Sequence, residues 1–299
     1  MIHGAQTRAR VTPQRAPGLL SSRRFKDGLV KAMVYIIILS GSVILMLPFA
    51  WMVSTSLKRP GAVFNWPPEW IPNPVVWSNY PKAWTSLPFN LFLKNTLIIT
   101  ITTVLGQTLT SSLVGYSFAR LRWMGRNSLF MVVLATMMLP HHVTMIPVFA
   151  IWKRLGFVDT LVPLIVPAFF GGGAFNIFLM RQFFMTIPLE LDDAAKIDGC
   201  KQMGIYWRII FPLSKPVIGT VAIFSFLHHW NEFLGPLIYL NSIRKYTLAL
   251  GLQLFRGQYD TKWELLMAAS VIVMMPVLVI YFLAQRYFVQ GIVFTGIKG

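Results

Sequence analysis

The chain has 299 residues, of which 55% are hydrophobic and only 12% are charged, and its mean hydropathy is +0.60. Soluble domains carry about 25% charged residues, so this sequence has too few polar side chains to cover a water-facing surface. Composition therefore excludes an ordinary soluble protein and indicates that lipid surrounds much of the chain. The formal charge of +17 would also suit a nucleic-acid-binding protein, so its distribution along the chain has to decide between the two.

Residues 1–31 form a basic tail. Seven of the 27 basic residues lie in it: Arg8, Arg10, Arg15, Arg23, Arg24, Lys26 and Lys31. A basic segment beside an apolar run is typical of the cytoplasmic side of a membrane helix, where it also contacts anionic lipid. We therefore expect a cytoplasmic tail in contact with membrane lipid, and no nucleic-acid partner. The apolar run that follows is too long for a signal peptide and lacks a cleavage site, so it is predicted to remain as a helix.

Six stretches are long and apolar enough to cross a hydrocarbon core about 30 Å thick, which needs about 20 helical residues. The six predicted spans are Ala32–Val53, Asn95–Ala119, Ser128–Ala150, Leu161–Met180, Val217–Leu240 and Leu265–Phe288. Six spans put both termini on one side, and the basic tail and the Arg120–Arg126 loop place that side in the cytoplasm. The sequence thus predicts an all-α, multi-pass inner-membrane protein with both termini cytoplasmic.

The first long connection, residues 54–93, is rich in proline and tryptophan. Proline prevents regular helix, and indole rings prefer the membrane–water interface. We expect an external segment that is either an ordered interfacial cap or a contact surface for an external partner.

The connection 188–216 is the longest predicted cytoplasmic loop after the tail. Pro188 can open a helix whose first turn carries Glu190, Asp192 and Asp193 at the positive end of the helix dipole. Ala194, Ala195 and Ile197 give this helix a small apolar face, and Gly199 suits a left-handed C-terminal cap. A second helical piece is predicted over Ile205–Phe211, stopped by Pro212 and Pro216. From the residues alone, the loop is either a docking helix without a partner in its own chain or a solvated connector.

Polar residues interrupt the fifth and second predicted spans, where they are costly unless they face protein or water. They include Gln107, Ser225, His228, His229, Asn231 and Glu232. Prolines and the Gly171–Gly173 run would also kink or break helices, which favours a transport pathway over simple anchoring. Trp230, Asn231 and Glu232 could contact a sugar, or could instead serve interhelical hydrogen bonding or an external binding protein. Adjacent histidines project about 100° apart on a helix, so no metal site is expected.

One motif ties the 188–216 loop to a known family. The motif consists of Asp193-Ala194-Ala195, then three residues, Gly199, nine residues, Ile209, one residue and Phe211-Pro212. It resembles the EAA loop of ABC-importer permeases, with Asp in place of Glu and Phe in place of Leu. From Ala32 onward, other stretches resemble the carbohydrate-uptake branch, and in particular the six-helix partner of the maltose-type pair. These are Asn95-Thr96-Leu97, Gly115–Leu121, Met138-Leu139-Pro140, Ile187–Leu191, Trp230–Phe233 and Gly296–Gly299.

The resemblance implies a type I importer permease fold, with residues 32–299 as the transmembrane domain. It implies that the EAA helix sits in a cleft of a nucleotide-binding ATPase subunit, which would bind ATP and Mg. The coupling residues would be Asp193, Ala194, Ala195, Ile197, Asp198, Gly199, Ile209 and Pro212. Further implied partners are a second, non-identical permease subunit, which in maltose-type pairs holds the sugar, and an extracytoplasmic solute-binding protein. The implied solute is a sugar or oligosaccharide, with a polyol or glycerol phosphate ester as the alternative.

Two other function classes are weaker. The sequence has no G-x-x-x-x-G-K-[ST] loop, so nothing in it predicts that the chain is its own ATPase. An ion-coupled secondary transporter would use Glu232 as its intramembrane carboxylate, but no internal repeat supports that reading. A membrane enzyme would need a catalytic constellation, and the sequence suggests none.

Overall fold

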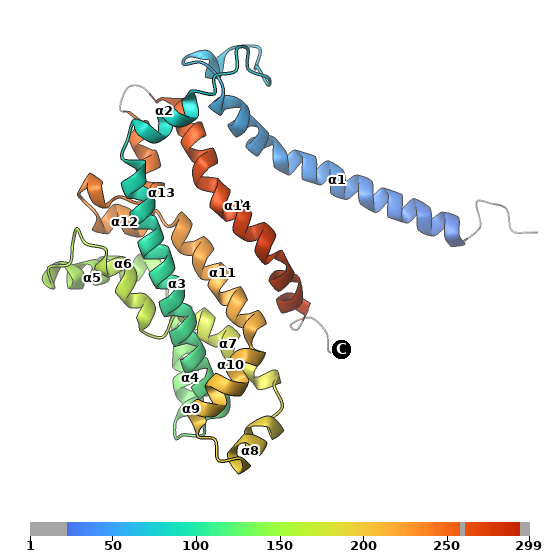
Figure 1. The fold of residues 1–299 in the computed structure, drawn as a ribbon, viewed down its shortest axis with the longest axis vertical. Helices are drawn as coiled ribbons and strands as arrows, with labels where there is room; N and C mark the ends of the chain where they lie inside the picture. Colours follow the sequence, from blue (N-terminus) through green and yellow to red (C-terminus); the bar gives the residue numbers. More distant parts are fainter. Residues whose placement is uncertain (1–22, 258–260, 294–299) are drawn as a thin grey trace, which may run out of the picture. The chain divides into compact units, whose positions relative to one another are not determined.

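The computed structural model describes residues 23–257 and 261–293, and every regular element in these ranges is helical (Figure 1). Most of the basic tail and the closing Gly296–Gly299 motif therefore lie outside the described residues. The chain divides into two units, one ending at Met52 and the other running from Val53 to Gly299. Each unit is described by itself.

The first unit consists, in its described part, of helix α1 (Arg23–Ser56), whose last turn belongs to the second unit. The helix covers the first predicted span and extends it at both ends. Its large apolar side chains are exposed from Leu29 to Leu47. A helix that is apolar on all sides is stable in lipid, so α1 has the character of a membrane-spanning helix.

The second unit begins with the proline-rich segment, which contains only the short helices η2 (Ala62–Phe64) and α2 (Asn79–Thr85). Hydrogen bonds hold this segment against the end of α1. The Asn79 amide donates to the carbonyls of Ser56 and Lys58 at 2.9 and 2.8 Å, and the Ser54 hydroxyl donates to Trp70 O at 2.7 Å. The segment is therefore ordered, and its place outside the membrane stays a prediction.

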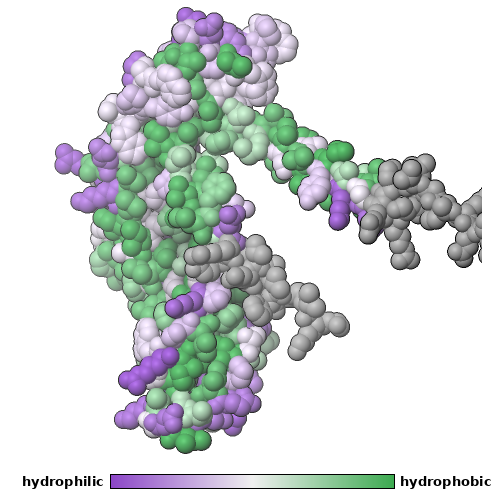
Figure 2. All heavy atoms as spheres, turned by 45° about the vertical axis from the view of Figure 1, so that its right-hand side comes forward, coloured by the Kyte–Doolittle hydropathy of each residue, from purple (hydrophilic) through white to green (hydrophobic). Residues whose placement is uncertain are grey.

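Four helices form the bundle of the second unit: α3 (Phe89–Arg120), α7 (Ala174–Thr186), α11 (Lys215–Asn231) and α14 (Trp263–Val293). Helix α3 packs against α7 and α11, and α11 packs against α14. At Gly115 a Cβ atom would lie 2.7 Å from Met180 Cβ, so only glycine allows α3 and α7 to approach this closely. On the visible face of the bundle, hydrophobic residues cover most of the middle and hydrophilic ones gather toward its two ends (Figure 2).

The single helix predicted over Ser128–Ala150 is wrong. The structure has two helices there, α4 (Arg126–Thr136) and α5 (His141–Arg154), separated by an extended Pro140 with φ −61° and ψ 132°. Proline cannot donate the hydrogen bond that would continue α4, and it forces the residue before it out of helical geometry.

Breaks also divide the fourth and fifth predicted spans. In the fourth, α6 (Val162–Ile165) and η3 (Val166–Phe169) precede three glycines with positive φ, and α7 follows. In the fifth, α11 ends at Asn231 and α12 (Leu234–Tyr239) begins after Glu232 and Phe233. The short elements η5 (Ile243–Lys245), α13 (Leu248–Leu252) and η6 (Gln253–Phe255) then lead to α14.

By length and composition, four helical stretches in the described residues could cross a membrane: Asp27–Ser56, Phe89–Arg120, Val162–Thr186 and Trp263–Gln285. A fifth is added if Gln202–Leu213 and Lys215–Asn231, which meet at 78°, count as one bent span. The sequence predicted six spans, and the difference lies in Ser128–Ala150, where neither α4 nor α5 is long enough alone.

Candidate functional site

Helix α8 (Glu190–Ile197) forms the centre of the 188–216 loop, as predicted from its acidic first turn. Its end is closed by two backbone hydrogen bonds, from Gly199 N–H to Lys196 O at 3.0 Å and from Cys200 N–H to Ala195 O at 2.8 Å. Gly199 has φ +82°, so the predicted left-handed glycine cap is confirmed. This pattern is the Schellman motif, which satisfies the last carbonyls of a helix and turns the chain sharply.

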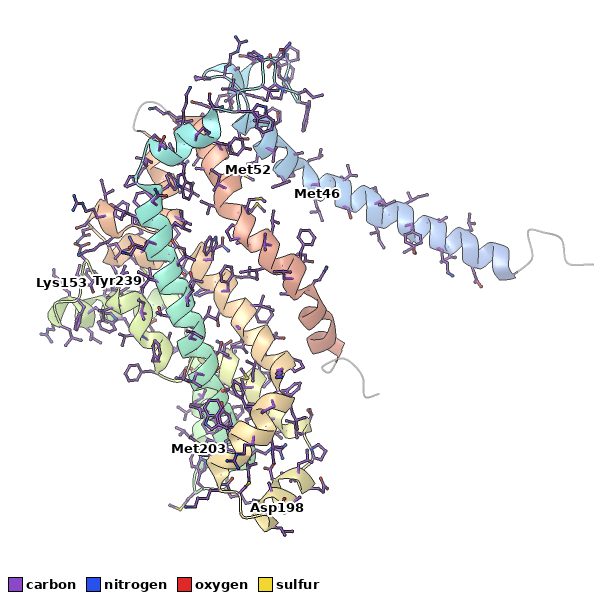
Figure 3. The ribbon with its side chains drawn as sticks, viewed as in Figure 1. Met46, Met52, Lys153, Asp198, Met203 and Tyr239 are labelled. Atoms are coloured by element: carbon purple, nitrogen blue, oxygen red, sulfur yellow. The ribbon has the colours of Figure 1, made fainter. Side chains whose placement is uncertain are left out.

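The α8 tip, which we define as Ala194, Ile197, Asp198 and Gly199, points away from the bundle. All four residues are exposed, and the Ile197 side chain is 87% exposed. Asp198, just after α8, and Met203, in α9 (Gln202–Ile205), lie toward the same end of the bundle (Figure 3). Leu189 and Leu191, at the start of α8, and Met203 of α9 are also exposed. An exposed apolar surface of this kind is typical of a contact site for another protein.

The opposite face of α8 is buried against α3 through an ion pair that sequence reasoning missed. Asp192 Oδ2 lies 3.7 Å from Arg120 Nη1, and the two side chains are 6% and 1% exposed. Arg120 also donates a hydrogen bond to Ile187 O, just before α8. Burial raises the pKa of Asp192, and the Arg120 charge opposes that rise. The pair therefore fixes α8 to the last residue of α3.

Two tyrosines continue this connection between α3 and the segment after α8. Tyr116 OH donates to Gln202 O at 3.1 Å, and Tyr206 OH shares a hydrogen bond with Ser112. Both rings are buried in one apolar cluster that also contains Ala195. The helix–loop–helix from Pro188 onward is thus packed onto α3 rather than hanging free.

Asp193, the acidic residue of the motif, is exposed and forms an ion pair with Lys196 at 2.8 Å on the same helix. The hydrogen bond from Lys196 lowers the pKa of the Asp193 carboxyl. The two adjacent aspartates therefore have different surroundings, with Asp192 turned to α3 and Asp193 to solvent. The sequence held a usable signal for the burial of Asp192, because Asp192 and the small Ala195 lie three residues apart and so share one helix face.

The prediction that Pro212 stops a helix is wrong. Helical structure continues from Gln202 through a π-helical turn, η4 (Tyr206–Ile210), into α10 (Phe211–Leu213), and the bend comes at Ser214. Pro212 is the second residue of α10 and directly follows the π-helical turn, where the regular i→i−4 hydrogen bonding is already interrupted. Pro212 is exposed, and Ile209 is partly buried against the cluster that contains Tyr206.

Trp230, Asn231 and Glu232 end helix α11, and the structure gives each a local partner. Trp230 is 3% exposed, donates to Val273 O of α14 at 3.1 Å and stacks on Phe226. Asn231 donates to Leu227 O, and Glu232 accepts the Gly235 N–H at 2.9 Å at the start of α12. These contacts favour the interhelical role over solute contact for Trp230.

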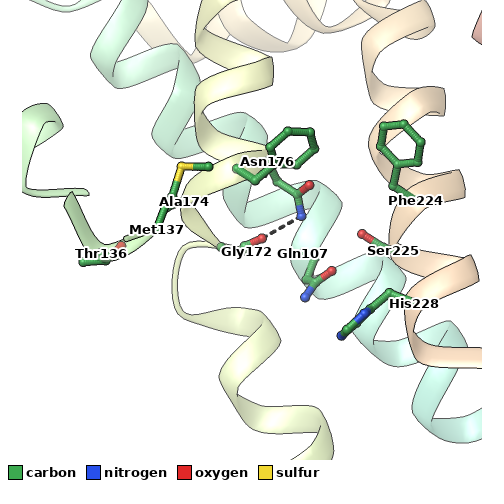
Figure 4. A pocket seen from close by; sticks show the side chains of 11 residues that line it. Gln107, Thr136, Met137, Gly172, Ala174, Asn176, Phe224, Ser225 and His228 are labelled. Carbon is green, nitrogen blue, oxygen red and sulfur yellow. Dashed lines mark hydrogen bonds between the residues drawn. The ribbon is translucent and has the colours of Figure 1, made fainter. Parts of the chain in front are cut away.

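A pocket of about 390 Å³ opens in the bundle beside the preceding part of α11, and we call it the bundle pocket (Figure 4). It lies between α3, the end of α4, the glycine break before α7, and α11. Its lining consists of Gln107, Thr136, Met137, Gly172, Gly173, Ala174, Phe175, Asn176, Phe224, Ser225 and His228. The sequence indicated Gln107, Ser225 and His228 as polar groups at depth, but only the fold brings them together.

Residues 107–294 match the family described as binding-protein-dependent transport system inner membrane component. The chain belongs to this family. The matched region contains both α8 and the bundle pocket. The chain is therefore a multi-pass inner-membrane permease subunit of a transport system that depends on a binding protein.

This permease is 38% identical to the arabinooligosaccharides transport system permease protein AraQ of Halalkalibacterium halodurans, over 69% of this chain and 73% of that one. It is 31% identical to the sn-glycerol-3-phosphate transport system permease protein UgpE of Yersinia pestis, over 87% and 94% of the two chains. Its fold matches that of a bacterial ABC transporter that imports the acidic polysaccharide alginate, with a TM-score of 0.77, 24% identity, and coverage of 89% and 98%. The permease therefore has the type I importer fold that the motif implied.

Proposed function

We propose that this permease imports a sugar or oligosaccharide, and that the α8 tip docks into a partner ATPase subunit on the cytoplasmic side. The observation that carries the proposal is the two-faced α8: an exposed tip on one side and a buried ion pair to α3 on the other. The names of relatives such as AraQ support the sugar assignment.

The geometry suggests how movement passes from the ATPase to the bundle. A displacement of the α8 tip has to move Arg120 as well, because separating a buried ion pair from its partner is costly. Arg120 is the last residue of α3, which packs on both α7 and α11. Docking at α8 would therefore shift the helices that line the bundle pocket, which is the requirement for alternating access.

The remaining partners follow from this role. ATP and Mg would be bound by the partner ATPase. A second, non-identical permease subunit would complete the pathway, and an extracytoplasmic binding protein would deliver solute. With α8 in the cytoplasm, the crossings of α11 and α14 return the C-terminus to the cytoplasm. A cytoplasmic N-terminus, and a segment 54–93 on the outside, further require that α4 and α5 together cross the membrane once.

The substitution Ala194→Arg tests the docking surface. Ala194 is exposed on the α8 tip, so arginine fits the free permease and obstructs only a close partner. We expect ATP-dependent uptake in proteoliposomes to fall by about tenfold or more, which a docking loss of only about 1.4 kcal/mol would cause.

Met124→Arg is the matched control, because Met124 is 99% exposed in the loop between α3 and α4 and lies outside α8. It should leave uptake and co-purification of the ATPase unchanged. Normal uptake by the Ala194→Arg variant would show that the α8 tip is not the docking site.

A further inference from the structure

The bundle pocket differs from the rest of the bundle in its chemistry. Its polar groups are two side-chain amides, two hydroxyls and one imidazole, and none of its eleven lining residues is Asp, Glu, Lys or Arg. A volume of about 390 Å³ is in the range of small-molecule sites. The pocket can therefore offer several neutral hydrogen-bonding groups and no fixed charge.

One hydroxyl in the pocket lacks a partner. Ser225 is 3% exposed, and its Oγ atom has no hydrogen-bond partner among the described residues. Figure 4 shows this oxygen directed from α11 toward Gln107 and Asn176. A buried hydroxyl without a partner is unfavourable, so its place in the wall of a pocket points to a bound ligand that completes it.

The glycine break positions the opposite wall. Gly172 has φ +69°, and a Cβ atom there would lie 2.4 Å from Gln107 O, so only glycine lets the chain approach α3 at this point. The Asn176 Nδ2 group donates to Gly172 O at 2.8 Å. This bond fixes the Asn176 amide and leaves its Oδ1 oxygen as an acceptor beside the pocket.

An aromatic pair completes the lining. Phe175 of α7 and Phe224 of α11 have ring centroids 6.3 Å apart, with 49° between the planes. Aromatic faces give an apolar surface that suits the C–H faces of a pyranose or furanose ring, whose hydroxyls project around its edge. The pocket thus combines apolar walls with neutral donors and acceptors.

We propose that the bundle pocket of this subunit binds one unit of a neutral, polyhydroxylated solute directly, an inference that rests on the import function proposed above. A phosphate or carboxylate group in such a site would lose its hydration without a cation to replace it. An acidic residue contacts the lining, since Glu232 Oε2 lies 3.5 Å from His228 Nε2. The pocket therefore disfavours a glycerol phosphate ester and an acidic polysaccharide.

The test uses the complete importer, with its partner subunits and binding protein, in proteoliposomes. The probes are a mixture of neutral oligosaccharides from hydrolysed arabinan, xylan and starch, together with sn-glycerol 3-phosphate and alginate oligosaccharides. Mass spectrometry of the vesicle contents measures which are imported with ATP. We expect neutral oligosaccharides to enter and both anionic probes to stay outside.

Two variants then test the pocket itself. Gln107→Leu and Ser225→Ala should each lower kcat/KM for uptake about fivefold, as loss of one hydrogen bond predicts. Ser225→Ala should not lower the unfolding temperature, because it removes a hydroxyl that has no hydrogen-bond partner in the described part of the chain. Ser270→Ala is the control, since that hydroxyl bonds within α14 to Leu266 O at 2.7 Å and lies outside the pocket.

The outcomes separate the two proposals. Unchanged neutral uptake in both variants, or import of alginate oligosaccharides alone, overturns the pocket assignment while leaving the import of oligosaccharides intact. Import of sn-glycerol 3-phosphate alone overturns both the pocket assignment and the sugar assignment. No ATP-dependent uptake of any probe overturns the import function itself.

Discussion

At the scale of single residues, we expect substitutions of the two adjacent aspartates of α8 to differ in their effect on stability and coupling. Asp192→Asn would leave the buried Arg120 charge without its counter-ion, which typically costs about 3–5 kcal/mol. Asp193→Asn would remove only an exposed pair with Lys196, which solvent screens and which therefore contributes little to stability. Thermal unfolding in detergent and the ratio of solute imported to ATP hydrolysed should both change for Asp192→Asn and stay near normal for Asp193→Asn. Equal behaviour of the two variants would remove the basis for a mechanical link to α3.

A second prediction at the scale of single residues concerns Asp159 and the dependence of folding stability on pH. It lies between α5 and α6 with φ +58°, and its carboxylate accepts hydrogen bonds from the backbone N–H groups of Asn241 and Ser242 at 3.0 and 2.9 Å. Bonds from Ser242 and from Lys245 lower the pKa of this carboxyl well below its usual range. A lowered pKa stabilises the folded state above the unfolded value of about 4, and the stabilisation is lost as pH falls toward the folded value.

Asn tolerates positive φ, so Asp159→Asn isolates the charge. The wild-type protein should unfold at a higher temperature than this variant near pH 7, and the difference should shrink as the pH falls below about 4. A difference that stays constant between pH 7 and pH 3 would show that the Asp159 charge does not hold the two loops together.

At the scale of elements, the end of α8 depends on backbone conformation rather than on space. No atom lies within 4 Å of a Cβ atom added at Gly199, so a side chain there meets strain only from φ +82°. Gly199→Val should cost about 1–2 kcal/mol and disturb the α8 tip, whereas Gly199→Asn should be tolerated better. Uptake by the two variants, at equal membrane insertion, measures the difference. If both lose uptake equally, contact with the partner at this position matters more than the turn.

At the scale of the whole molecule, the proposed topology places the α8 tip inside the cell and the segment 54–93 outside. Ile197 and Trp66 are both highly exposed, at 87% and 88%, so each can be replaced by cysteine in a Cys200→Ser background that has no other thiol. A membrane-impermeant maleimide should label Trp66→Cys in intact cells from which any outer barrier has been removed. It should label Ile197→Cys only in inverted vesicles, and labelling of both from one side would refute the topology.

The sequence by itself determined the class of the molecule and the place of its coupling element. Composition alone required a lipid environment, because hydrophobic side chains are too many and charges too few for a water-facing surface. The acidic first turn and Gly199 predicted α8, because caps and helix dipoles are local interactions between residues close in the chain. The spacing from Asp193 to Pro212 indicated the family, because this motif also lies within one short segment of the chain.

Only the tertiary structure decided what depends on packing between distant segments. Helix α4 ends before Pro140, whereas helical structure continues through Pro212 after a π-helical turn, so the effect of a proline depends on the hydrogen bonding around it. Arg120 meets Asp192 across 72 positions of sequence, and Gln107, Asn176 and Ser225 come from three helices. No local pattern encodes such meetings, because they arise from the close approach of α3, α7 and α11 that glycines at 115 and 172 permit.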